Sequence, residues 1–192
     1  MEYLIVGIIS YLMGSIPFGY ILTKIFLKQD IRQIGSGNIG ATNALRTGNK
    51  LIGYSTLILD IAKAIIPVIY VKINYPELIY IASLCAFLGH VFPIWLKFKG
   101  GKGVACFFGG NLLLMPIPTV FAMIIWLLVV KFSKLSSFGA LLSIFVLTSY
   151  ELIFIYGTLN KVIILLLFVL IFLKHSSNIK RLIKGQENKI DL

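Results

Sequence analysis

One stretch of the chain concentrates glycine, hydroxyl, amide and guanidinium groups. It runs from Ile34 to Arg46 and reads IGSGNIGATNALR. Glycines allow a positive φ and let successive N–H groups face one point, which is how proteins build anion sites. The hydroxyl and amide side chains add donors, and an arginine can bind a phosphate through two N–H groups. The stretch therefore predicts a phosphate or carboxylate site formed by Gly35, Ser36, Gly37, Asn38, Gly40, Thr42 and Arg46.

The glycines of this stretch also match the dinucleotide-binding pattern G-x-G-x-x-G. Gly35, Gly37 and Gly40 supply the glycines, and Asp60 follows twenty residues after the last of them. That pattern requires a preceding strand and a soluble βαβ unit, whereas Asp60 falls inside an apolar run. We therefore exclude dinucleotide binding. The remaining structural alternative is a flexible glycine-rich connector.

A second glycine-rich stretch, Phe98-Lys99-Gly100-Gly101-Lys102-Gly103, leads directly into an apolar run. The start of a helix has free N–H groups and a positive dipole end, so glycines and a lysine there form a ready anion site. Gly101 and Lys102 are the candidates for binding, while Lys97 and Lys99 are assigned to membrane topology. His90, at the end of the preceding run, is expected to be a hydrogen-bonded structural residue.

Two further polar groups lie outside these stretches. His175 and Asn178 are three positions apart, so they share a helical face if the helix continues through them. The basic residues around them also fit a cationic segment that binds anionic lipid headgroups. Asp60 and Lys63 have the same spacing inside an apolar run, where an isolated charge is unfavourable, and they are expected to form a structural ion pair.

The elements that carry these groups must be membrane helices. Of the 192 residues, 58% are hydrophobic and only 13% are charged, against about a quarter charged in soluble domains. The net charge of +11 is large for such an apolar chain. Cys85 and Cys106 fit no disulfide or metal pattern, so we expect no metal and no cofactor.

Apolar runs alternate with basic segments along the chain. The first run is interpreted as a retained span because it begins with Glu2 rather than a cationic segment. Pro116 and Pro118 interrupt the fourth run, which we therefore divide near Met115–Pro118 into two short spans. The last run is short and is expected to start before Lys161. The runs are Tyr3–Leu22, Leu51–Val71, Leu78–Leu96, Val104–Val130, Phe138–Tyr156 and Val162–Leu173.

The cations set the expected orientation of these spans. Fifteen of the 18 Lys and Arg residues lie in segments that the positive-inside rule places in the cytoplasm. Lys102 and Lys131 fall on the same side only if the fourth run is two spans. We therefore expect a single all-α membrane domain, residues 1–192, with seven transmembrane helices, some of them short. Its N-terminus would lie outside and its C-terminus in the cytoplasm.

Five segments, in order, resemble the successive motifs of one family. They are GSIPFGY, IGSGNIGATNALRTGNK, LDIAKA, GHVFPIWLKFKGGKGVA and KHSSNIKRLIKGQENK. They resemble the bacterial acyl-phosphate:glycerol-3-phosphate acyltransferases, the PlsY family, over nearly the whole chain. This resemblance implies a seven-span protein of the bacterial inner membrane with a cytoplasmic active site. The implied reaction transfers a fatty acyl group from acyl phosphate to the 1-hydroxyl of glycerol 3-phosphate, giving lysophosphatidic acid and phosphate, the first acylation step of phospholipid synthesis.

The resemblance also implies roles for individual residues. It places Arg46 on phosphate, Gly101 and Lys102 on glycerol phosphate, and His175 and Asn178 at the catalytic centre. Glu187 matches a structural position, and Ser137 matches a serine on the phosphate side. Ala64 and Lys134 depart from the glycine and serine that are usual in the family. The implied catalytic residues are Ser36, Arg46, Lys102, His175 and Asn178.

The residues are consistent with this chemistry because both substrates carry phosphate and acyl phosphate is already activated. The proton of the attacking hydroxyl would pass to His175 or to a substrate phosphate, and the resemblance favours the second route. Membrane lipid and the enzyme that produces acyl phosphate are the implied partners, and nucleic acid is not one. A transporter of organic phosphates would also need anion sites and broken spans, but its polar groups should continue to the outer face. A topology factor that binds anionic lipid would not require the Ile34–Arg46 stretch.

Overall fold

The computed structural model describes residues 1–190, and within that range every regular element is helical. The chain forms two compact units, described separately below. Unit 1 comprises Met1–Leu114, and unit 2 begins at Met115. The expectation of an all-helical protein is therefore confirmed for the described part of the chain.

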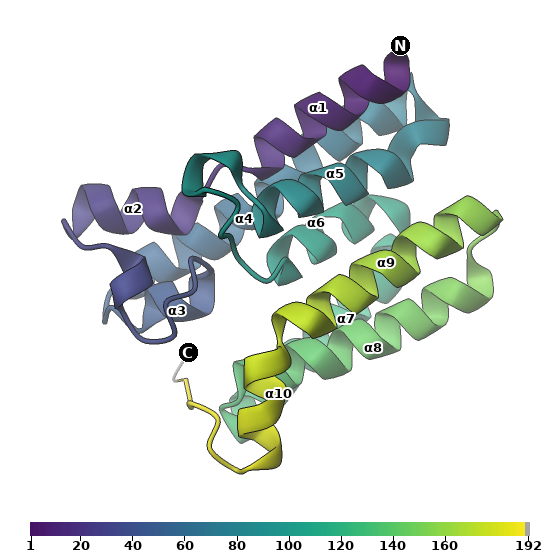
Figure 1. Ribbon diagram of the computed structural model, residues 1–192. Coiled ribbons are helices and arrows are strands. Elements are labelled where there is room, and N and C mark those ends of the chain that lie inside the picture. Colours follow the sequence, from purple (N-terminus) through teal and green to yellow (C-terminus); the bar gives the residue numbers. More distant parts are fainter. Residues whose placement is uncertain (191–192) are drawn as a thin grey trace. The chain divides into compact units, whose positions relative to one another are not determined.

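Unit 1 contains five longer helices, four of which, α1, α4, α5 and α6, pack side by side (Figure 1). Short helical turns connect them: η1 (Ile31–Gln33), α3 (Ala41–Leu45), η2 (Pro76–Leu78) and η3 (Ile94–Leu96). The longer helices are α1 (Glu2–Gly14), α2 (Phe18–Phe26), α4 (Lys50–Asn74), α5 (Ile79–Val91) and α6 (Val104–Leu114).

Small residues allow the helices of unit 1 to approach closely. A Cβ on Gly14 of α1 would overlap the carbonyl of Ala86 on α5, and a Cβ on Gly89 of α5 would overlap the carbonyl of Tyr11. Close backbone packing at small residues is the usual way in which membrane helices associate, because lipid chains compete with larger apolar side chains. Beside this contact, Tyr11 donates a hydrogen bond to the carbonyl of Phe92 over 2.7 Å.

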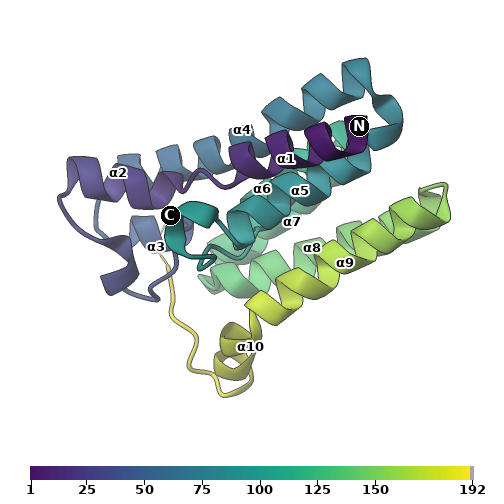
Figure 2. The ribbon, with the colours of Figure 1, turned by 45° about the horizontal axis from the view of Figure 1, so that its top comes forward.

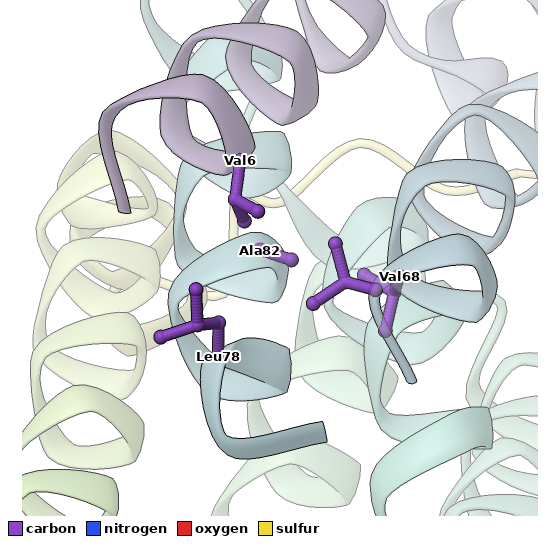
Figure 3. Close-up of a cluster of buried hydrophobic side chains, with 5 residues drawn as sticks. Val6, Val68, Leu78 and Ala82 are labelled. Carbon is purple, nitrogen blue, oxygen red and sulfur yellow. The ribbon is translucent and has the colours of Figure 1, made fainter. Parts of the chain in front are cut away.

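A buried apolar cluster joins α1, α4 and α5 at the other end of α1 (Figure 3). Val6, Val68 and Ala82 come from these three helices, while Leu78 ends the turn that precedes α5. Each of these side chains is at most 4% exposed. The cluster therefore anchors the part of unit 1 that is farthest from the glycine-rich loops along α1 and α4.

Two breaks interrupt the long apolar runs. By hydropathy the first apolar run is a single span. In the structure it forms two helices, because Pro17 separates α1 from α2. The fourth run ends as α6 at Leu114, and α7 restarts at Pro116 with Met115 as its N-cap. Proline at the first helical position is favourable because its missing N–H is not needed there. The predicted division of this run near Met115 is therefore confirmed.

Unit 2 contains α7 (Pro116–Ser133), α8 (Ser136–Phe154), α9 (Thr158–Lys174) and α10 (Ser176–Ile183). Helix α8 packs against both α7 and α9. Helix α9 begins before Lys161, as predicted, and α10 turns away from it by 59° (Figure 2). The condition set for His175 and Asn178, a helix that continues through both, is not met, because His175 ends α9 and caps α10.

Within the described residues, four helical segments are long and apolar enough to cross a membrane, or five if α9 and α10 count as one bent span. The expected number of seven is not reached by this measure. Helix α4 is 25 residues long, but it contains Asp60 and Lys63. Helix α6 has only 11 residues. The four segments are Glu2–Phe26, Pro76–Leu96, Pro116–Ser133 and Ser136–Phe154.

Candidate active site

Asn43 holds the first glycine-rich loop in shape. Its side chain is buried, and its Nδ2 lies 2.8–3.0 Å from the carbonyl oxygens of Ile31, Ile34 and Asn38. Its Oδ1 accepts a hydrogen bond from the N–H of Ser36 over 2.9 Å. One amide side chain therefore satisfies four backbone groups of a loop that has no regular hydrogen-bonding partner. The sequence suggested that Asn43 donates to a ligand, whereas the structure shows that it supports the loop.

Gly35 brings Arg46 against this support. Its φ of 53° is in the left-handed region that glycine adopts most readily. A Cβ on Gly35 would lie 2.5 Å from Asn43 Oδ1 and 2.9 Å from Arg46 Cδ. The aliphatic part of Arg46 therefore lies against Gly35, and its guanidinium is carried at the end of helix α3, which Arg46 caps.

Several N–H groups of the loop are engaged within it. The N–H of Ser36 bonds to Asn43, that of Gly37 to the carbonyl of Ile34, and that of Gly40 to Asn38 Oδ1. These glycines thus shape the loop. Among the polar side chains of the loop, Ser36, Thr42 and Arg46 are each half-buried or exposed.

Arg32, in the turn η1 just before this loop, forms a surface ion pair. Its guanidinium donates to Asp30 with an N–O distance of 2.6 Å and lies 4.9 Å from the ring centre of Tyr20. The hydrogen bond from Arg32 lowers the pKa of Asp30 to about 2. Arg32 therefore has a carboxylate partner within its own turn.

The second glycine-rich loop is attached to the end of α5. The N–H of Gly100 donates to the carbonyl of Val91, and the N–H of Gly101 donates to the carbonyl of His90 over 3.1 Å. Gly103 has a φ of 88°, and a Cβ there would overlap the ring of Phe87. Lys102 lies between Gly101 and Gly103 and is half-buried. The loop thus presents one lysine just before α6 begins.

Asp60 and Lys63 form the predicted ion pair in α4. Lys63 Nζ lies 2.8 Å from Asp60 Oδ1, and both side chains are buried. Lys63 also donates to the carbonyl of Ile16 over 2.6 Å, at the break between α1 and α2. A buried charge is tolerated only when it is paired and hydrogen-bonded, so this pair has a structural role in unit 1.

Glu187 gathers three donors in unit 2. Its carboxylate accepts from Ser137 Oγ over 2.9 Å, from Asn178 Nδ2 over 2.6 Å and from Arg181 Nε over 2.7 Å. The last residues thereby join α10 to the first turn of α8. Ile190 adds a backbone bond to the carbonyl of Lys134. The hydroxyl of Ser137, expected on the phosphate side, is bonded to this carboxylate.

His175 lies at the bend between α9 and α10 and is 2% exposed. Its Nδ1 lies 2.8 Å from the carbonyl oxygen of Ile171. Because a carbonyl can only accept, Nδ1 carries the hydrogen, and in the neutral ring Nε2 has the lone pair. His175 is therefore oriented as a proton acceptor through Nε2. Asn178, one turn later, is held by Glu187.

Replacing Glu187 with glutamine should destabilise unit 2 at neutral pH. Burial raises the pKa of Glu187, but hydrogen bonds from Arg181, Asn178 and Ser137 outweigh it and leave the pKa below the ordinary value. The stabilisation is complete above the ordinary glutamate pKa and is lost as the pH falls through the lower folded-state pKa. Losing charge-assisted bonds worth about 2 kcal/mol should lower the Tm by roughly 5 °C.

The measurement is thermal unfolding of the purified protein in detergent at pH 7 and pH 4. The difference in Tm between the unchanged protein and Glu187→Gln should shrink at pH 4. Asn188→Ala, at an exposed neighbouring position, is the control and should leave the Tm unchanged. Equal Tm values for the protein and Glu187→Gln at pH 7 would contradict the structural role.

In residues 1–190, no group of three or more His, Cys, Asp and Glu side chains is placed to hold a metal ion. The candidate residues instead form two clusters of phosphate-type ligands in unit 1 and one histidine–asparagine cluster in unit 2. Unit 1 contributes Ser36, Thr42, Arg46 and Lys102, and unit 2 contributes His175 and Asn178.

Comparisons with known proteins assign the chain to one family. Residues 4–185 match the family model described as glycerol-3-phosphate acyltransferase. A glycerol-3-phosphate acyltransferase of Pelagibacter ubique is 57% identical over 189 residues, covering 98% of each chain. One from Bartonella henselae is 45% identical over 97% of this chain and 90% of its own.

Solved structures agree with this assignment. A crystal structure of PlsY, described as an integral membrane glycerol 3-phosphate acyltransferase in its glycerol 3-phosphate form, has a TM-score of 0.92 and 30% identity. It covers 100% of this chain and 96% of that one. The lysophosphatidic acid form has a TM-score of 0.89 and 29% identity. The chain therefore belongs to the PlsY family of glycerol-3-phosphate acyltransferases, which are integral membrane enzymes.

Proposed function

We propose that this protein transfers a fatty acyl group from acyl phosphate to the 1-hydroxyl of sn-glycerol 3-phosphate. The observation that carries the proposal is the pair of glycine-built loops in unit 1, which hold Arg46 against Gly35 and Lys102 between Gly101 and Gly103. Two cationic loops suit a reaction in which both substrates bear phosphate. The glycerol 3-phosphate and lysophosphatidic acid forms of PlsY support the acceptor and the product.

Each candidate site residue of unit 1 has a proposed role in binding phosphate. Ser36 and Thr42 donate hydroxyl hydrogen bonds, Asn38 shapes the turn at Gly40, and Arg46 binds a phosphate through two N–H groups. Lys102 contributes a compact charge just before α6, next to Gly101, whose backbone packs against the ring of His90. Gly35 and Gly37 let the backbone turn so that Ser36, Thr42 and Arg46 lie on one loop.

The chemical step needs no covalent enzyme intermediate. The 1-hydroxyl oxygen attacks the carbonyl carbon of acyl phosphate, an ester bond forms, and the bond between that carbon and the phosphate oxygen breaks. The proton of the hydroxyl passes to His175 Nε2 or to a substrate phosphate, and inorganic phosphate leaves. In the substrate-assisted route, which we favour, His175 and Asn178 orient the reacting groups. Glu187 and Ser137 keep Asn178 in place.

The membrane arrangement is also a proposal. We propose one catalytic domain with seven crossings of the bacterial inner membrane, an external N-terminus and a cytoplasmic active site. The clustering of fifteen cations in alternate segments supports this orientation. The break at Met115 supports two crossings, a short one at α6 and a longer one at α7, where the sequence has one apolar run. A cytoplasmic site would receive acyl phosphate from the enzyme that makes it.

The acyl donor gives the most direct test. Purified protein should convert labelled glycerol 3-phosphate to lysophosphatidic acid with long-chain acyl phosphate. With acyl-CoA the reaction should be at least ~100-fold slower, because the thioester lacks the phosphate that the site is built to bind. Thin-layer chromatography of the labelled lipid measures both rates.

Two outcomes would overturn the proposal. Equal rates with acyl-CoA would show that the donor is wrong. Accumulation of labelled glycerol 3-phosphate inside vesicles, with no lysophosphatidic acid formed, would indicate a transporter. Catalytically inactive protein carrying Arg46→Ala controls for acyl transfer that occurs without the enzyme.

A further inference from the structure

His90 occupies the space between the buried ion pair of α4 and the lysine-bearing loop. It lies in the last turn of α5 and is 3% exposed. Its Nδ1 lies 3.8 Å from Asp60 Oδ1, the same oxygen that pairs with Lys63. The sequence alone suggested only a structural histidine at this position. The structure shows instead that one edge of its ring faces a fixed charge pair.

The opposite edge of the ring lies against Gly101. A Cβ on Gly101 would overlap His90 Nε2 and approach Cε1 and Cδ2. The same two residues are joined through their backbones, because the N–H of Gly101 donates to the carbonyl of His90. The loop is therefore attached to His90 by both its backbone and its ring.

The charge pair itself is held on several sides. Lys63 donates to the carbonyl of Ile16, and its ammonium lies 5.8 Å from the ring centre of Phe18. On α6, Cys106 Sγ lies 3.2 Å from the carbonyl oxygen of Asp60 and donates to it. The Asp60–Lys63 pair is consequently tied to the break between α1 and α2 and to α6. These contacts fix the position of Asp60 within unit 1.

The residues on both sides of Lys102 are connected to Asp60. On the N-terminal side, Gly101 contacts His90, which faces Asp60. On the C-terminal side, α6 begins at Val104 and bonds to Asp60 through Cys106. A side chain held from both flanks by packed groups has a narrow range of positions, and misplacement by about 1 Å can reduce a rate ~100-fold.

We propose that His90 is a positioning residue that sets the place of the Gly101–Lys102 loop relative to the Asp60–Lys63 pair, so that Lys102 meets the phosphate of glycerol 3-phosphate. This inference rests on the proposed function. His90 does not touch substrate in this scheme. It acts through the loop, and its replacement changes binding of the acceptor rather than of the acyl donor.

The test is a kinetic comparison of His90→Ala, His90→Gln and Ser83→Ala in purified protein. His90→Ala should raise the KM for glycerol 3-phosphate ~10-fold or more, with kcat within ~3-fold and the KM for acyl phosphate within ~2-fold. His90→Gln should recover most of the loss, because its amide reaches the position of Nε2 beside Gly101. Ser83 is buried on α5, two turns earlier, and its alanine variant is the matched control.

A double variant makes the test specific to the contact with Gly101. Gly101→Ala alone should raise the KM for glycerol 3-phosphate, because the new methyl group collides with the imidazole. In His90→Ala/Gly101→Ala the methyl group enters the space that the ring has left. The KM should then be at least ~10-fold below the product of the two single effects, which is the signature of residues in contact.

The outcomes separate this inference from the proposed function. No lysophosphatidic acid from the unchanged protein would overturn the function itself. An active protein in which His90→Ala has an unchanged KM would overturn only the inference. Equal losses for both substrates, with no recovery in His90→Gln or in the double variant, would show a merely structural histidine. Thermal unfolding of each variant identifies a folding defect, and Gly101→Ala with the double variant keeps the test decisive in that case.

Discussion

Replacing Arg46 with alanine should lower kcat/KM for acyl transfer by at least ~100-fold, because a doubly hydrogen-bonded phosphate loses a contact of about 3 kcal/mol. The guanidinium lies at the end of α3, and its stem packs against Gly35. The loop itself is held by Asn43, so it should survive the loss of Arg46. The expected result is therefore a folded but nearly inactive protein.

The measurement is steady-state production of lysophosphatidic acid at varied concentrations of both substrates. Arg46→Lys keeps the charge but not the planar pair of donors, so its activity should fall between those of the unchanged protein and Arg46→Ala. Arg32→Ala is the matched control. It removes an exposed arginine of the same loop whose partner is Asp30, and kcat/KM should change by less than ~3-fold.

A result in which Arg46→Ala and Arg32→Ala lose equal activity would contradict the proposed site. It would mean that the loop contributes general positive charge, as in the lipid-binding alternative. Raising the salt concentration should then suppress the activity of the unchanged protein to the same extent, since a diffuse surface charge is screened.

Replacing His175 with alanine should reduce kcat by ~10²- to 10³-fold if the ring accepts the proton, the range typical of general base catalysis. The bond from Nδ1–H to the carbonyl of Ile171 leaves Nε2 as the acceptor in the neutral ring. If the substrate phosphate accepts the proton instead, His175 supplies one oriented hydrogen bond. The loss should then be closer to ~10-fold.

The pH dependence of kcat distinguishes these two routes. A proton-accepting His175 produces an acidic limb in the profile that disappears in His175→Ala. An orienting His175 leaves the shape of the profile unchanged and permits partial recovery in His175→Gln. Ser177→Ala, at an exposed position of α10, is the control and should retain full activity.

The role of His175 would be contradicted by a His175→Ala protein with unchanged kcat and KM. A variant that fails to unfold cooperatively would instead point to the bend between α9 and α10. Thermal unfolding of His175→Gln separates the two explanations, because glutamine can keep a hydrogen bond to Ile171.

Features that depend on neighbours in the sequence were predictable. Pro116 and the opposing basic segments indicated a break near Met115, and α7 begins one residue later. The i, i+3 spacing of Asp60 and Lys63 predicted their ion pair. In both cases the deciding interaction lies within one or two helical turns, where backbone geometry limits the alternatives.

Features that depend on distant parts of the chain were not predictable in the same way. The sequence grouped Asn43 with the hydrogen-bond donors of its loop, but its amide bonds to carbonyls up to twelve residues away. Ser137 bonds to Glu187, fifty residues later. Whether the helix continues past His175 was left open by the sequence, and the structure shows a bend of 59° between α9 and α10. Polar residues in loops have many possible partners, and only the folded loop selects among them.

The sequence by itself determined that this is a helical membrane protein with two glycine-rich cationic loops, because composition and local patterns express hydrophobicity and backbone freedom directly. The tertiary structure alone decided which polar groups support the loops and which distant residues they contact. Asn43 donates to and accepts from its own loop, Glu187 accepts from Ser137 and Asn178, and His90 lies between Asp60 and Gly101. The reason is that a buried polar group must find a partner, and that partner is set by packing across the chain.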